Sequence, residues 1–248
     1  MTVNKVSEKS KVSVSTHSWN VLQGCEYQCS YCWARRMKKI YKQDDSVRLR
    51  EDWLEDDLGE GRIVFVAEVS DIGGHWQKEE EVLRVLEHCR RFDNTYIFGT
   101  KNPHGLVKYV PFMPAKVILW VTVESNTDHE VSLAPPPKER IEGIFELFNE
   151  GLQAKLCVSM EPLLKFDPVI LKDWLEVLRP SILYLGLDSR DKHKNFSDRH
   201  GLLPEPSAEE IKWLYSFGKE VCGIVMVKEN LWSLLGIEQE RMIYNAEM

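Results

Sequence analysis

Residues 25–32 read Cys25-Glu26-Tyr27-Gln28-Cys29-Ser30-Tyr31-Cys32, so three of the chain's six cysteines stand in one short stretch. At the spacing C-x3-C-x2-C, each thiolate can bind a different iron of one cubane cluster, which leaves the fourth iron open to a small molecule. A structural zinc site instead needs four protein ligands, and no further Cys or His stands nearby at finger-like spacing. The stretch predicts an iron–sulfur site. A zinc or other metal knuckle and a reactive-thiol loop are the alternatives.

Strand-like and helix-like patterns alternate on both sides of this stretch. A predicted strand over 16–22 precedes it, and a predicted helix over 33–41 follows it. Segments with helical apolar spacing separate six further strand-like runs, at 63–69, 96–98, 117–123, 155–159, 182–187 and 221–227. Strands that alternate with helices form a parallel sheet, and runs that are apolar throughout indicate that both faces are covered. We therefore predict an α/β fold, a partial TIM-type (β/α)6–7 barrel, with a flat doubly wound sheet as the alternative.

Length and charge limit the number of domains and the kinds of partner that the chain can have. The chain has 248 residues and a net charge of −7, which argues against a surface built for non-specific duplex binding. No linker divides it, so we predict one domain over 1–248, with a flexible tail over 1–14 and a core from about 16 to 230. No apolar run approaches the ~20 residues that cross a bilayer, and the first residues lack the apolar segment of a secretory signal. We expect a cytoplasmic protein that makes no membrane contact.

The other three cysteines have a different setting. Cys89 falls on the apolar face of a predicted helix, and Cys157 and Cys222 lie in or beside predicted strands. Cysteines in such places are small core residues more often than ligands. We therefore expect only the trio in residues 25–32 to bind a metal cluster.

The trio resembles the signature of the radical S-adenosylmethionine (SAM) superfamily, C-x3-C-x-aromatic-C, with Tyr31 at the aromatic position. The resemblance implies a [4Fe–4S] cluster bound by Cys25, Cys29 and Cys32, with SAM chelating the open iron through its amino and carboxylate groups. It also implies reductive cleavage of SAM to methionine and a 5′-deoxyadenosyl radical. An electron donor such as flavodoxin or ferredoxin is the implied partner.

Other stretches resemble a narrower family, the three-Cys-motif phage proteins. They are Trp19-Asn20 before Gly24-Cys25, Thr100-Lys101-Asn102-Pro103, Val123-Glu124 and Ser159-Met160-Glu161-Pro162-Leu163-Leu164. This resemblance runs from about residue 16 to 230 and implies no particular substrate. Spore photoproduct lyase, a radical SAM enzyme that repairs DNA, is a more distant relative in general layout. It brings a nucleic-acid substrate into consideration.

Chemistry in parallel barrels collects where the strands end. By the superfamily resemblance, the end of the second strand approaches the SAM amino group, and Ser70, Asp71 or a backbone carbonyl fills that role. The end of the fourth strand meets the SAM ribose, where Glu124 or Ser125 fits. Glu161, at the end of the fifth strand, is a candidate for the adenine or substrate side.

The last two strands and the first helix supply the candidates for substrate binding. The sixth and seventh strands end near Asp188, Arg190 and Lys228. Basic residues also begin the helix after the cysteines and fill the loop that contains Arg190. They are compatible with a phosphate-bearing or nucleic-acid substrate, whereas the acidic residues among them favour an ordinary solvated loop.

These residues are compatible with three functions. The leading hypothesis is a radical SAM enzyme that abstracts hydrogen from an unidentified substrate. The second is a binding module that bears a metal cluster but does not cleave SAM. An electron-transfer iron–sulfur protein is disfavoured, because ferredoxin-like sites use four cysteines.

Overall fold

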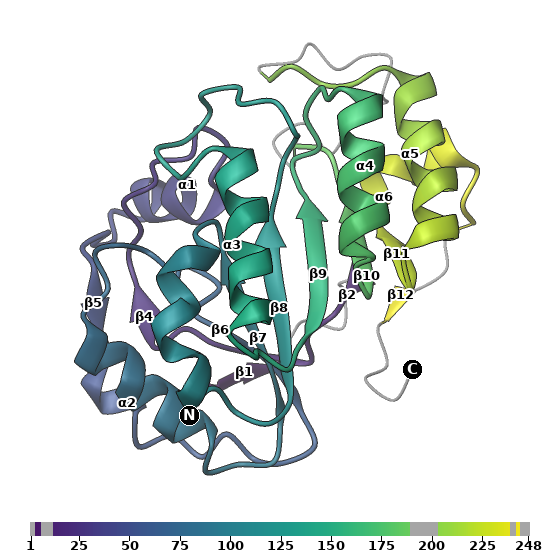
Figure 1. The fold of residues 1–248 in the computed structure, drawn as a ribbon. Coiled ribbons are helices and arrows are strands. Elements are labelled where there is room, and N and C mark those ends of the chain that lie inside the picture. Colours follow the sequence, from purple (N-terminus) through teal and green to yellow (C-terminus); the bar gives the residue numbers. More distant parts are fainter. Residues whose placement is uncertain (1–2, 6–11, 189–202, 239–241, 244–248) are drawn as a thin grey trace.

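The computed structural model describes residues 3–5, 12–188, 203–238 and 242–243 (Figure 1). Among these residues, the largest sheet has eight strands in the order β1-β3-β6-β7-β8-β9-β10-β11. Its strands are β1 (Val3–Lys5), β3 (His17–Trp19), β6 (Ile63–Val66), β7 (Thr95–Thr100), β8 (Val117–Thr122), β9 (Lys155–Met160), β10 (Ile182–Leu185) and β11 (Ile224–Val227). β1 is antiparallel to β3, and the other neighbouring pairs are parallel. The parallel strands follow one another in chain order, without the reversal of a doubly wound sheet. The described edge strands β1 and β11 do not pair with each other, so the predicted partial (β/α) barrel is confirmed.

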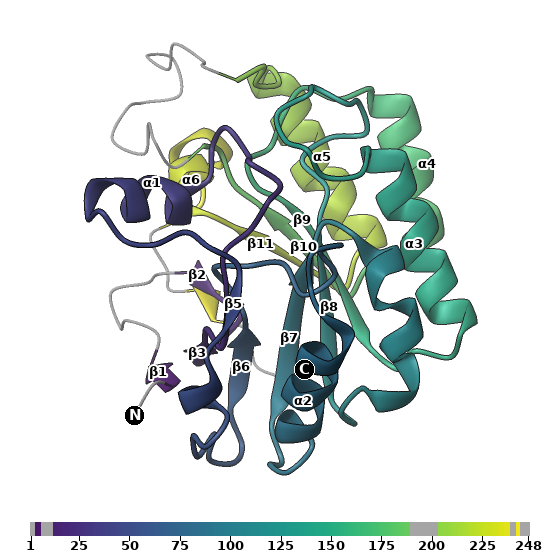
Figure 2. The same ribbon diagram turned by 90° about the vertical axis from the view of Figure 1, so that its left-hand side faces the viewer.

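Helices connect the parallel strands, as the alternating pattern predicts. They are α1 (Trp33–Ile40), α2 (Glu79–Cys89), α3 (Pro137–Asn149), α4 (Pro168–Leu178), α5 (Ala208–Val221) and α6 (Glu229–Leu235), with 3₁₀ segments over Glu51–Trp53 and Pro103–Phe112. Figures 1 and 2 show α2, α3, α4 and α5 along the outer face of the sheet. None of the described helices has the length and apolar character that a membrane crossing requires.

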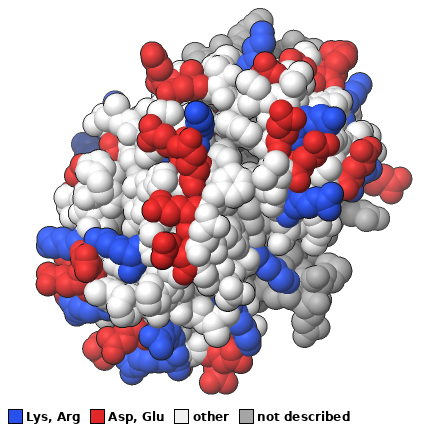
Figure 3. Space-filling view, in the orientation of Figure 1, with Lys and Arg blue, Asp and Glu red and all other residues white. Residues whose placement is uncertain are grey.

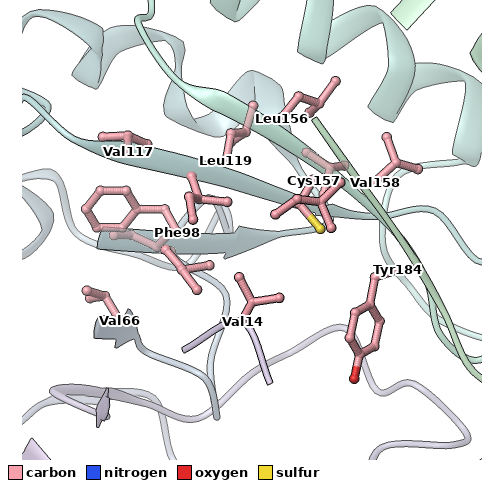
Figure 4. Close-up of a cluster of buried hydrophobic side chains, with 14 of the residues drawn as sticks. Val14, Val66, Phe98, Val117, Leu119, Leu156, Cys157, Val158 and Tyr184 are labelled. Carbon is pink, nitrogen blue, oxygen red and sulfur yellow. The ribbon is translucent and has the colours of Figure 1, made fainter. Parts of the chain in front are cut away.

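The core lies between this sheet and its helices. Figure 4 shows Leu119 and Leu156 on one side of the sheet and Tyr184 on the other, where Val14 also lies. Successive side chains of a strand point to opposite faces, and burial of both faces explains why the strands are apolar throughout. The face of the sheet that bears Tyr184 is therefore the inner face, which lines the interior of the barrel.

Local signals explain where several elements begin and end. A capping box begins α5, because the Ser207 side chain accepts from the Glu210 backbone amide and the Glu210 side chain accepts from the Ser207 amide. The predicted strand over 63–69 is too long, since Ala67 takes a left-handed φ of 57° directly after β6 and turns the chain. The strand predicted over 221–227 is three residues too long at its start, because Val221 is the last residue of α5 and β11 begins at Ile224.

The segment before the cysteines also differs from the prediction. The strand expected over 16–22 is interrupted after β3, and β4 (Leu22–Gln23) pairs antiparallel with β5 (Arg48–Leu49). Part of the segment expected as a flexible tail pairs with other strands. β1 extends the main sheet, and β2 (Val12–Ser13) pairs with β12 (Met242–Ile243). These additions leave the parallel core unchanged.

Candidate functional site

A cavity of about 450 Å³ lies at the carboxyl ends of the parallel strands. One wall is the cysteine loop (residues 25–32), and residues at or just after the ends of β6, β7, β9, β10 and β11 form much of the remainder. Cys25, Cys29 and Cys32 all line it, and each is half-buried. This is the edge at which parallel barrels place their active sites.

Tight backbone turns shape the cysteine loop. Gly24 has a φ of 81°, and a Cβ added there would lie 2.5 Å from the backbone oxygen of Ser46. Gln28 also takes a left-handed φ, of 52°. Cys32 is the N-cap of α1, and its Sγ accepts from the Arg35 amide at 3.4 Å. The loop therefore presents its thiols from a folded turn at the start of a helix.

The protonation of the thiols follows from their burial. The pKa of Cys25 is raised to about 12, mainly by burial; a hydrogen bond with the Tyr27 backbone opposes this rise, and the nearby Asp71, Cys29 and Cys32 contribute to it. Burial also raises the pKa of Cys29 above its ordinary value. Both are therefore neutral thiols at pH 7 in the metal-free chain, and a metal that binds them must displace their protons.

The donor set fits an iron–sulfur cluster better than a single ion. The three thiols are free of disulfides and line one cavity. Within the described residues, no three Cys, His, Asp or Glu side chains stand close enough together to hold one metal ion. A cubane cluster spreads its thiolate ligands over separate irons, so it tolerates wider spacing than a closed zinc site does.

Ser70 and Asp71 line the cavity after β6, and both are already hydrogen-bonded. The Asp71 carboxylate accepts from the Gly73 amide at 3.0 Å, the Thr100 hydroxyl at 2.6 Å and the Lys101 amide at 2.7 Å. The Ser70 hydroxyl donates to the Gly24 carbonyl at 2.5 Å. Asp71 therefore fixes the turn after β7, and Ser70 fixes the start of the cysteine loop. The assignment of either to the SAM amino group stays a prediction.

Glu124 lies behind the cysteine loop, outside the cavity lining. Its carboxylate contacts Lys101 and Arg140 and accepts from the hydroxyl of Tyr31, which does line the cavity. Burial alone raises the pKa of Glu124, but the two cations outweigh it and lower the pKa to about 2. The Ser125 hydroxyl donates to the Lys165 carbonyl at 2.6 Å and is also outside the lining. Ribose binding by either residue stays a prediction, and their observed partners are structural.

The candidate substrate residues fall into two groups. Glu161, Asp188 and Lys228 line the cavity together, and the Lys228 ammonium donates to Glu161. Arg190 lies outside the described residues. The strand ends thus brought three of these four side chains to one wall, as the parallel topology predicts.

An aromatic floor, formed by Phe65, Trp120 and Tyr184, was not predicted. All three line the cavity. The ring centroids of Phe65 and Trp120 are 5.8 Å apart, and those of Trp120 and Tyr184 are 5.0 Å apart. The rings come from β6, β8 and β10, which are alternate strands of the barrel. These aromatic residues lie within apolar strands, so the sequence does not distinguish them from core residues. Only knowledge of which side chains in each strand face the barrel interior could have identified them.

No protein-family model and no curated protein matches the sequence. Solved structures do match. A spore photoproduct lyase variant with bound AdoMet and dinucleoside spore photoproduct is 14% identical, covering 91% of this chain and 78% of that one, with a TM-score of 0.62. Streptococcus suis SuiB bound to precursor peptide SuiA is 10% identical, over 88% of this chain and 50% of that one, with a TM-score of 0.51. The enzyme anSMEcpe with bound AdoMet and a peptide is 9% identical, over 91% and 62%, also with a TM-score of 0.51.

These likenesses show that the chain has the fold of radical SAM enzymes. The resemblance to three-Cys-motif phage proteins stays a prediction.

Proposed function

We propose that this chain, which shares its fold with radical SAM enzymes, binds a [4Fe–4S] cluster and S-adenosylmethionine and uses them to abstract hydrogen from a substrate. One observation carries the proposal: three thiols from one loop line a single cavity at the carboxyl edge of the sheet. The fold supports it, since the similar structures include enzymes with bound AdoMet.

Cys25, Cys29 and Cys32 would hold the cluster through three of its irons. When bound, the cluster and SAM together supply the electron and the carbon radical that removes hydrogen. The chain would contribute ligation and orientation, which is what a protein usually supplies in cofactor chemistry. A one-electron donor such as flavodoxin or ferredoxin is part of the proposal.

The substrate would lie against the aromatic floor, beside the Glu161–Lys228 pair. Aromatic side chains stack on nucleobases, so the floor supports a nucleotide or nucleic-acid substrate. The similar spore photoproduct lyase variant, whose structure holds a dinucleoside spore photoproduct, supports the same class of substrate. The face in Figure 3 intersperses acidic and basic side chains, with no continuous basic surface there. We therefore propose recognition of one nucleotide unit in the cavity rather than of a long duplex on that face.

The first test is iron binding under anaerobic reconstitution. The wild-type chain should take up about four irons per chain, and Cys29→Ala should lose most of them. The matched control is Cys157→Ala, which removes a fully buried thiol of β9 and should keep the wild-type iron content. Circular dichroism checks that both variants fold.

Two results would count against the proposal. Equal iron in the two variants would show that residues 25–32 do not bind the cluster. A chain that binds the cluster and never cleaves SAM would be a cluster-bearing binding module instead.

A further inference from the structure

A buried group of charged residues lies directly behind the cysteine loop. The Tyr31 hydroxyl donates to Glu124, and the Lys101 ammonium donates to both of these residues. Arg140 donates to the other Glu124 oxygen. The side chains of Glu124 and Arg140 are only 3% and 4% exposed, and that of Lys101 is 12% exposed. A carboxylate so deeply buried keeps its charge only in a fixed arrangement of donors, so this group is rigid.

The group joins the cysteine loop to three separate elements. Lys101 follows β7, Glu124 follows β8, and Arg140 lies in the first turns of α3. Arg140 also donates to the carbonyls of Thr122 at 2.9 Å and Pro135 at 2.6 Å. It therefore holds both ends of the β8–α3 connection (residues 123–136).

The same connection holds the cysteine loop through its backbone. The Ser30 amide donates to the Val131 carbonyl at 2.9 Å, and the Leu133 amide donates to the Tyr27 carbonyl at 2.7 Å. The connection is fixed in turn at Lys165, whose carbonyl accepts from the Ser125 hydroxyl at 2.6 Å. The loop is thus attached at Tyr27, Ser30 and Tyr31 to a support that is itself tied to the sheet.

We propose that Tyr31, Glu124, Lys101 and Arg140 form a positioning network that holds Cys29 and Cys32 in the geometry required to bind the cluster. Tyr31 lies between these two cysteines in the sequence. Hydrogen bonds to its hydroxyl therefore restrict the movement of the backbone that carries both thiols. None of the four is proposed to touch the reacting atoms. The proposal rests on the proposed function for the identity of the ligand, but the network can be tested without it.

The test compares Tyr31→Phe with Tyr96→Phe. Each substitution removes one hydroxyl and keeps the ring. Tyr96 is fully buried in β7, and its hydroxyl accepts from the Asn94 side chain and donates to the Phe92 backbone carbonyl. None of these three residues lines the cavity. Tyr96→Phe therefore controls for the loss of a buried tyrosine hydroxyl as such.

In the metal-free chain, hydrogen exchange should accelerate in peptides covering 25–33 and 128–136 for Tyr31→Phe and remain at the wild-type rate there for Tyr96→Phe. In the reconstituted chain, Tyr31→Phe should weaken iron retention against a chelator by about 10- to 100-fold, as loss of a supporting hydrogen bond does at other metal sites. Tyr96→Phe should retain iron as the wild type does. The spectrum of the reduced cluster should also change in Tyr31→Phe alone.

Wild-type exchange in both peptides of Tyr31→Phe would overturn the network, whether or not the chain binds iron. Unchanged iron retention and spectrum in a Tyr31→Phe chain that binds a cluster would also overturn it. Failure of the wild-type chain to bind iron would instead overturn the proposed function, and the exchange comparison would still decide on the network.

Discussion

Glu124 is a buried carboxylate that stays ionised because two cations lie against it. Desolvation disfavours its charge, and Lys101 and Arg140 reverse the balance. Buried ion pairs of this kind add little net stability relative to apolar residues, but removal of one partner leaves an unpaired charge in the interior. The network behind the cysteine loop is therefore sensitive to single substitutions.

Glu124→Gln should destabilise the chain by about 3–5 kcal/mol, because Lys101 and Arg140 would remain buried without their counterion. Urea unfolding measures this loss. The matched control is Glu146→Gln, which breaks a surface pair with His104 in which the Glu146 side chain is 47% exposed, and should cost less than ~1 kcal/mol. Equal losses in the two variants would contradict the buried network.

The same carboxylate predicts a pH dependence. The pKa of Glu124 is lowered from 4.5 to about 2 in the folded chain. Its stabilisation is therefore fully present above about pH 4.5 and is lost as the pH falls towards 2. The difference between a pKa of 4.5 and one of about 2 corresponds to about 3 kcal/mol of folding stability.

Unfolding curves of wild type and Glu124→Gln across this window isolate the effect, since other carboxylates titrate in both chains. The difference between the two should shrink as the pH falls. A difference that stays constant would show that Glu124 is not the group that titrates.

For individual residues, the sequence predicted which side chains lie at the site better than it predicted their contacts. The three cysteines reach one cavity as their spacing indicated, and Tyr31 lines it. The role of Glu124 could not be predicted, because its partners Lys101 and Arg140 are 23 and 16 residues away and meet it only through the fold.

Gly24, directly before the cysteine loop, has a left-handed φ of 81° and lies close to the Ser46 backbone. Gly24→Ala would force a left-handed φ on an alanine, which costs about 1–2 kcal/mol, and would place a Cβ 2.5 Å from the Ser46 oxygen, adding ~1–3 kcal/mol of overpacking. The control Gly151→Ala has a φ of 92° with no atom within 4 Å of the added Cβ, so it should cost only the backbone strain. Urea unfolding compares the two, and equal costs would show that the close approach at Ser46 is unimportant.

Among the elements, regular patterns were predicted well and short or turned segments were not. The helix predicted after the cysteines follows local rules and is confirmed. The pairing of β4 with β5 involves two residues on each side, too few to leave a periodic pattern. The end of β6 is set by the left-handed φ of Ala67, which an alanine in an apolar run does not signal.

For the whole molecule, the alternation of apolar strands and amphipathic helices was sufficient to predict the architecture. Seven parallel strands follow one another in chain order around the sheet, because each helix returns the chain to the same edge. That order places all the carboxyl ends, and with them the candidate site, on one side. The interior aromatic floor was missed, since the sequence does not distinguish a residue that faces a cavity from one that faces a packed core.

Reductive cleavage of S-adenosylmethionine, which we propose for this site, would be detected as the formation of 5′-deoxyadenosine. The anaerobically reconstituted wild-type chain should form it from SAM when dithionite is added, and Cys29→Ala should form none above the protein-free background. If a wild-type chain with its full complement of iron forms no 5′-deoxyadenosine, the site does not cleave S-adenosylmethionine by reduction.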